Sequence, residues 1–108
     1  MPHDPGTAQI LRDDLADLPV TERRMFGALC FLLHGHMVCD TFQDGAMFRV
    51  GKPDHAQALT LPGVITMAMG GSQIAGFVQL SGEDVADERR RAPLLTLALA
   101  FVKSLPPK

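Results

Sequence analysis

Two apolar runs joined by a turn of only two residues constrain the fold of this chain most strongly. Residues 28–33 and 36–42 are separated by His34-Gly35 alone. A two-residue loop that contains Gly, flanked by strand-forming runs, is typical of a tight β-hairpin. The chain is therefore predicted to contain an antiparallel sheet, and the short loop fixes which residues of the two strands face each other.

The predicted hairpin register places the two cysteines together. With His34-Gly35 as the loop, Cys30 comes opposite Cys39 in a non-hydrogen-bonded pair. The two thiols form a candidate redox pair, Cys30 and Cys39. Free thiols that pack as small hydrophobic groups are the favoured interpretation, because thiols in the cytoplasm stay reduced. Strand parity puts His36 on the opposite face from these thiols, so no metal site is expected.

Further elements follow from periodicity and from turn residues. Helical spacing with Pro19 as a stop predicts a first helix over 7–18. Pro93 is expected to start a final helix with a wide apolar stripe, which serves either the core of the domain or a homodimer. Between the hairpin and this last helix the sequence predicts a strand at 46–50, a short helix from 51–54 to about 61–63, strands at 64–69 and 74–80, and a short acidic helical turn from Ser81.

Length and apolar content bound the organisation of the chain. With 108 residues and 46% hydrophobic content, a single domain over 1–108 is expected, with residues 1–6 disordered. The longest apolar stretch, 93–102, is shorter than the roughly 20 residues that cross a bilayer. We expect a cytoplasmic protein that makes no use of a membrane.

The charge of the chain argues against nucleic acid as its main partner. The net charge is −2, so the broad positive field that binds phosphates without regard to sequence is missing. Two basic clusters remain, Arg23-Arg24 and Arg89-Arg90-Arg91. Acidic neighbours from Glu83 to Glu88 are expected to neutralise the second cluster. Weak nucleic-acid binding through both clusters stays open as a second alternative.

No pattern of catalytic residues is present. The sequence has no phosphate-binding GxxxxGK[ST] loop, no GxGxxG after a strand, no GxSxG and no HExxH. The chain is therefore expected not to be an enzyme, with no catalytic residues, no cofactor and no metal. An alternative is a small-molecule-binding or enzymatic module that uses a pocket near Gly70-Gly71, lined by Arg49 or Lys52.

Short motifs in a fixed order resemble the TfoX/Sxy N-terminal domain family. Met25-Phe26-Gly27 is similar to the Met-Phe-Gly-Gly that opens the family's sheet, with Ala28 in place of the second Gly. Gly76-Phe77-Val78 resembles the family's Gly-aromatic-Val segment in the fifth strand. Three further segments are similar to family motifs: the hairpin turn at 33–37, the strand at 47–51 and the Leu-Pro-Pro-Lys end of the closing helix.

This resemblance implies a fold and a role. The implied fold is α+β, an antiparallel sheet of about five strands packed with N-terminal and C-terminal helices, as in YjbR-like proteins. In full-length regulators the domain is joined to a C-terminal domain, and those proteins promote competence gene expression with the cyclic-AMP receptor protein. A chain of 108 residues is expected to be a stand-alone domain.

The leading hypothesis is a small regulatory or adaptor domain that acts by protein–protein contact in transcriptional or competence-type regulation. The expected partner is a protein, such as a component of the transcription machinery. The candidate binding residues are Arg23, Arg24, Met25, Phe26, Gly27, Arg49, Lys52 and Gly71.

Overall fold

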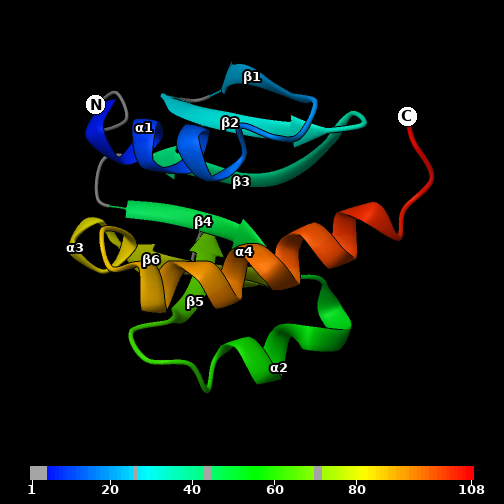
Figure 1. The fold of residues 1–108 in the computed structure, drawn as a ribbon. Coiled ribbons are helices and arrows are strands. Elements are labelled where there is room, and N and C mark those ends of the chain that lie inside the picture. The colour runs from blue at the N-terminus through cyan, green and yellow to red at the C-terminus, as the bar shows by residue number, and fades with distance from the viewer. Residues whose placement is uncertain (1–4, 26, 43–44, 70–71) are drawn as a thin grey trace.

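Six antiparallel strands form one sheet in the order β1-β2-β3-β4-β6-β5 (Figure 1). The computed structural model describes residues 5–25, 27–42, 45–69 and 72–108. The strands are β1 (Val20–Met25), β2 (Ala28–Leu33), β3 (His36–Phe42), β4 (Gly45–Arg49), β5 (Ile65–Met69) and β6 (Ser72–Ser81). The helices are α1 (Pro5–Asp14), η1 (Lys52–Asp54), α2 (His55–Ala58), α3 (Gly82–Val85) and α4 (Glu88–Lys103). The predicted α+β class is confirmed.

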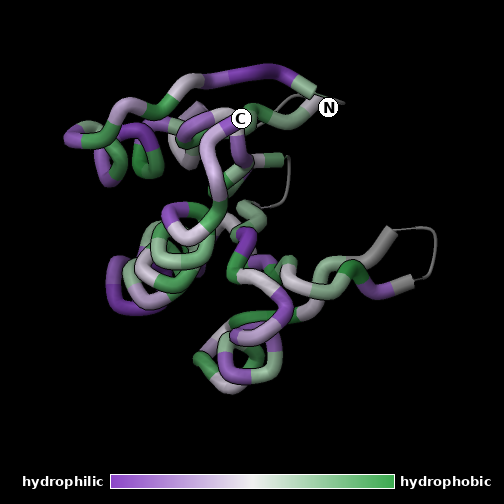
Figure 2. The backbone as a smooth tube through the Cα atoms, turned by 90° about the vertical axis from the view of Figure 1, so that its right-hand side faces the viewer, coloured by the Kyte–Doolittle hydropathy of each residue, from purple (hydrophilic) through white to green (hydrophobic). Residues whose placement is uncertain are grey.

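Helices α1 and α4 cover one face of the sheet. Both lie on the same side of the strands in the two perpendicular views of Figures 1 and 2. Phe31 of β2 and Phe48 of β4 are fully buried beneath this layer, together with Leu94 of α4. The core therefore lies between this face, here called the helix-bearing face, and the helices. The wide apolar stripe of the last helix is used largely in this core, where Leu94, Leu95, Ala98 and Val102 are buried.

The hairpin turn between β2 and β3 has the predicted form. His34 and Gly35 adopt φ values of 54° and 85°. Positive φ at both central residues is the requirement of the type I′ turn that best joins two twisted strands. Leu33 pairs with His36, as the two-residue loop predicts.

The predicted pairing of Cys30 with Cys39 is wrong. The register of β2 and β3 shifts between Phe31 and Leu32, so that Phe31 pairs with Cys39 and Cys30 pairs with Asp40. A bulge inserts one extra residue into one strand and moves the following residues to the other face of the sheet. Cys39 consequently belongs to the core cluster, whereas Cys30 projects from the opposite face. Thiols that point to opposite faces cannot form a disulfide without backbone movement.

The sheet has one strand more than predicted. β1 reads Val-Thr-Glu-Arg-Arg-Met and is exposed over its four middle residues. It lies at the edge of the sheet and pairs only with β2. An edge strand with two solvated faces gives no apolar alternation, so its sequence lacks the usual strand signal.

The helix boundaries differ from the predicted ones at both ends of the chain. α1 begins at Pro5 and ends at Asp14, so the expectation that residues 1–6 are disordered is wrong for Pro5 and Gly6. α4 begins at Glu88 and contains Pro93 in its interior. The Asp87 carboxylate accepts a hydrogen bond from the Arg89 N–H at 3.0 Å and caps this earlier start.

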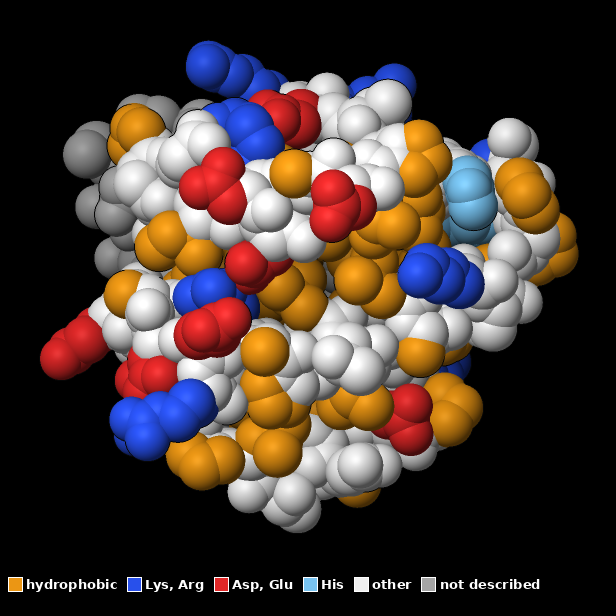
Figure 3. Space-filling model, viewed as in Figure 1, with side chains coloured by type: hydrophobic (Ala, Val, Ile, Leu, Met, Phe, Trp, Pro, Cys, Tyr) orange, Lys and Arg blue, Asp and Glu red, His pale blue; other side chains and the backbone are white. Residues whose placement is uncertain are grey.

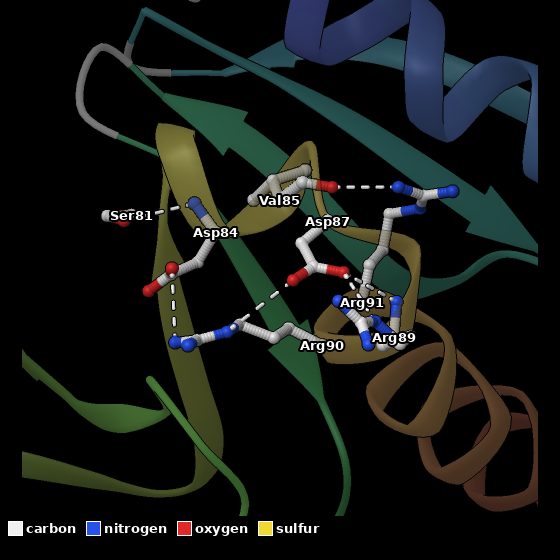
Figure 4. Close-up of polar contacts among 7 residues, drawn as sticks. All are labelled: Ser81, Asp84, Val85, Asp87, Arg89, Arg90 and Arg91. Atoms are coloured by element: carbon white, nitrogen blue, oxygen red, sulfur yellow. Dashed lines mark hydrogen bonds and ion pairs between the residues drawn. The ribbon is translucent and has the colours of Figure 1, made fainter.

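Asp84 and Asp87 pair with arginines at the start of α4, as predicted for two of the four acidic neighbours (Figure 4). Arg90 lies 3.2 Å from Asp84 and 3.8 Å from Asp87. Arg91 is only 8% exposed, and its Nη1 donates to the carbonyl of Val85 at 2.8 Å. Its guanidinium also pairs with Asp14, which joins α4 to α1. Two of the three arginines are thus part of the scaffold.

Candidate functional site

The second face of the sheet carries an apolar pocket to which all six strands contribute. We call this pocket, about 340 Å³ in volume, the methionine groove. It contains four of the six methionines in the chain, and none of its residues belongs to a described helix. Its lining residues are Met25, Ala28, Cys30, Met37, Asp40, Phe42, Met47, Met67, Ile74 and Phe77.

Strand register explains why these residues share a face. Arg23, Cys30, Asp40, Met47 and Gln79 pair in turn across five strands. Residues directly opposite in neighbouring antiparallel strands project to the same face, with the strands roughly 4.8 Å apart. This row crosses the groove, with Asp40 and Met47 at its centre. The bulge in β3 brings the carboxyl group of Asp40 to this face.

Asp40 is the acidic residue of the groove. It is 8% exposed, and its Oδ1 has no hydrogen-bond partner among the described residues. Burial raises the pKa of this carboxyl group to about 6, while a hydrogen bond from the Met47 backbone acts in the opposite direction. Most copies of the side chain are still ionised at neutral pH. The groove thus holds a carboxylate in apolar surroundings.

The thiol of Cys30 is poorly suited to nucleophilic or redox chemistry. Burial, followed by the negative charge of Asp40, raises its pKa to about 11, and the positive charge of Arg23 lowers it less. Burial also raises the pKa of Cys39 well above its ordinary value. A thiol reacts as its thiolate, which these pKa values make scarce at neutral pH.

A second pocket, about 320 Å³ in volume, lies beside Arg49. The guanidinium carbon of Arg49 is 5.9 Å from the ring centre of Phe77 and 5.3 Å from that of Phe101. Both distances fall within the range of cation–π contact. Lys52 and Gly76 also line this pocket.

Glycine lets the backbone approach closely in this second pocket. Gly76 has φ 88°, and its carbonyl accepts hydrogen bonds from the N–H groups of Val50 and Gly51. A Cβ atom on Gly51 would lie 2.4 Å from Cδ1 of Phe101. The backbone at Gly76 therefore lies close to that of residues 50–52, and this approach shapes the Arg49 pocket.

The predicted site residues divide between these two places. Met25 lines the methionine groove, whereas Arg49 and Lys52 line the second pocket. Arg23 and Arg24 are exposed on β1, and Gly27 lies in the turn that follows with φ 81°. Phe26 and Gly71 lie outside the described residues. Arg23 and Arg49 belong to the same sheet face but stand three strands apart.

The helix-bearing face shows no extended basic surface. In Figure 3, acidic and basic side chains are interspersed on this face with hydrophobic ones. Arg12 of α1 makes two contacts with Glu22 of β1, at 2.6 and 2.8 Å. Paired arginines of this kind do not supply the concentrated positive field that phosphate binding requires. No group of three or more potential metal ligands occurs within the described parts of the chain.

Sequence reasoning missed Asp40, Met37 and Met47 as members of a site. The available signal was the unbroken apolar run of β2, Ala-Leu-Cys-Phe-Leu-Leu, which does not alternate with polar residues. A strand that is apolar on both faces indicates that both faces of the sheet avoid water. The bulge in β3 gave no comparable signal, so the sequence did not predict that Asp40 lies on the groove face.

Comparison with known proteins gives one match. The family model described as the TfoX N-terminal domain matches residues 13–102. This range runs from the end of α1 through nearly all of α4 and includes every strand. Neither the curated proteins nor the solved structures include a significant match.

Proposed function

Because the chain belongs to the TfoX N-terminal domain family, we propose that it is a cytoplasmic regulatory or adaptor domain that acts by binding a protein partner. The partner is a component of a transcriptional or competence-type regulatory system. The domain performs no catalytic step; it holds the partner through the methionine groove. Among its described helices, none is long and apolar enough to cross a bilayer.

The observation that carries this proposal is the methionine groove itself. Methionine side chains are flexible and polarisable, and they recur on protein surfaces that adapt to partner segments. Ile65 of the edge strand β5 is 55% exposed and pairs with Gln79, at the end of the row that crosses the groove. Ile65 lines a separate hollow together with Phe42, which also lines the groove. An apolar pocket near an exposed aliphatic side chain is typical of a surface for interaction.

Capture with matched variants tests the proposal. Met25 and Met67 are half-buried at two ends of the groove, so glutamate is tolerated there better than at buried Met47. Tagged wild type, the double variant Met25→Glu/Met67→Glu and the control Thr96→Glu, at an exposed position on α4, are incubated with lysate of the protein's own source. Circular dichroism verifies the fold of each.

The proposal requires a stoichiometric protein that wild type and Thr96→Glu capture and that the groove variant loses. Equal capture by all three proteins would contradict the proposal, because the partner would then bind a surface other than the groove. The absence of any stoichiometric partner would instead shift weight to a ligand-binding role.

The Arg49 pocket favours a second candidate function, a module that binds a small anion. Arg49 makes no ion pair among the described residues, and its guanidinium lies within cation–π distance of two aromatic rings. A ligand that binds only the folded state raises the melting temperature. A panel of carboxylate and phosphate metabolites should then stabilise wild type but not Arg49→Gln. If no compound raises the melting temperature, this candidate is excluded.

A further inference from the structure

One carboxylate interrupts the apolar wall of the methionine groove. Asp40 lines this pocket and is only 8% exposed, and its Oδ1 has no hydrogen-bond partner in the part of the chain that the structure describes. None of the ion pairs in the described part of the chain includes Asp40. Buried polar groups in folded proteins almost always have a hydrogen-bond partner, and an orphan among them needs an explanation.

The Met47 backbone hydrogen-bonds to the Asp40 carboxyl group, but no described residue provides a partner for Oδ1. Cys30 and Met47 flank it in the cross-strand row, and neither side chain is a strong donor. Arg23 is the next residue of the row beyond Cys30 and is exposed on the edge strand, two strands from Asp40. At that distance and exposure, water and salt largely screen the attraction between the Arg23 guanidinium and the Asp40 carboxylate.

We propose that the partner segment bound in the methionine groove is apolar with one cationic side chain, a Lys ammonium or an Arg guanidinium, that pairs with Asp40. This inference rests on the proposed function and specifies the chemistry of its partner. Apolar side chains of the segment contact Met25, Met37, Met47 and Met67, while the cation reaches the carboxylate.

The shape and chemistry of the groove fit such a side chain. Lys and Arg carry long apolar stems that pack against hydrophobic surface while the charged end reaches a polar group. Phe42 and Phe77 also line the groove, and aromatic faces attract cations. A divalent metal ion fits poorly, because Asp40 is the one carboxylate among the lining residues. An anionic segment would meet the charge of Asp40 directly.

Three small probes with the same apolar chain test whether the groove prefers a cation, and they do so without knowledge of the partner. Binding of n-hexylammonium, 1-hexanol and hexanoate to the ¹⁵N-labelled full chain is followed by NMR shifts of backbone amides at pH 8, where Asp40 is ionised. We expect hexylammonium to bind the groove on the order of tenfold more tightly than hexanol, as a charge-assisted hydrogen bond would give. Hexanoate should bind most weakly.

Two variants assign this preference to Asp40. Asp40→Asn should bind hexylammonium and hexanol equally, whereas Asp17→Asn, at an exposed carboxylate after α1, should behave as wild type. Equal binding of hexylammonium and hexanol to wild type would overturn the inference, as would a preference that persists in Asp40→Asn. Neither result bears on whether the groove docks a partner. That role is tested separately, by whether the Met25→Glu/Met67→Glu variant loses the partner that wild type captures. If no probe shifts the groove amides, the inference is likewise overturned.

Discussion

Asp40 is buried on the helix-free side of the sheet because β3 contains a bulge that reverses the parity of its residues. Without the bulge, Cys39 would face Cys30 and Asp40 would project to the core face. The chain keeps Cys39 in the core and Asp40 in the methionine groove. A single inserted residue thus places an ionisable group in apolar surroundings.

Asp40 should make the stability of the domain depend on pH. Burial raises its pKa to about 6 in the folded state, above the ordinary value of 3.8, so the folded state binds more protons between these two values. Its contribution to the free energy of unfolding is fully present below about pH 4 and is lost as pH rises through 6. The free energy of unfolding of wild type should fall by on the order of 1 kcal/mol between about pH 5 and pH 8 relative to Asp40→Asn. Urea denaturation of both proteins at the two pH values measures this difference.

All other ionisable groups are the same in both proteins, so the comparison isolates Asp40. If the free energy of unfolding changes with pH in the same way for wild type and Asp40→Asn, burial does not disfavour the ionised form of this carboxyl group, and the account is contradicted.

The two cysteines should stay unreactive in the folded protein. Burial raises both thiol pKa values, to about 11 for Cys30 and well above the ordinary value for Cys39. Native protein at about pH 8 should react with a thiol-specific disulfide reagent far more slowly than protein unfolded in urea, since thiolate is scarce. Mild oxidation should give no loss of two hydrogens by mass spectrometry. An intramolecular Cys30–Cys39 disulfide formed under native conditions would refute the observed register.

At the level of elements, the start of α4 depends on its cap. The Asp87 side chain accepts from the Arg89 N–H at 3.0 Å and lies near Arg89 and Arg90. Asp87→Ala removes this acceptor and should lower the free energy of unfolding by about 1 kcal/mol. Thr96→Ala, an exposed change in the middle of the same helix, is the matched control and should leave stability unchanged or raise it by roughly 0.5 kcal/mol. Chemical denaturation compares the two, and equal losses would contradict the role of the cap.

Elements with strong local signals could be predicted, and those set by tertiary contacts could not. His34-Gly35 located the hairpin because few sequences adopt positive φ at two successive residues. Ser81, whose Oγ accepts from the Asp84 N–H at 3.3 Å, gave the start of α3. The charged strand β1 was missed because its pairing with β2, rather than its own pattern, makes it a strand. Asp87 was overlooked as a cap because Pro93 gave a more familiar start signal.

The candidate site was less predictable than the fold. Met25, Arg49 and Lys52 were candidate binding residues whose relative positions the sequence left open. The structure places Met25 in the methionine groove and Arg49 and Lys52 in the second pocket. The methionine groove draws on six strands, and its composition depends on registers and on one bulge. Such an arrangement becomes visible only when the strands are paired.

On the scale of the whole molecule, the sheet has two unlike faces. Helices α1 and α4 cover the helix-bearing face and complete the core there (Figure 1). The opposite face presents the methionine groove, with Asp40 inside it and Ile65 beside it. This asymmetry is the basis of the claim that the domain binds its partner through the face that its helices leave open.

Site-specific photo-crosslinking in the source cells tests that claim most directly. A benzophenone amino acid replaces either Ile65, which is 55% exposed beside the groove, or Thr96, which is exposed on α4 of the helix-bearing face. The account predicts a discrete adduct with a partner protein from position 65 and none from position 96. An adduct from position 96 with none from position 65 would contradict it, because the partner would then lie on the face that carries the helices.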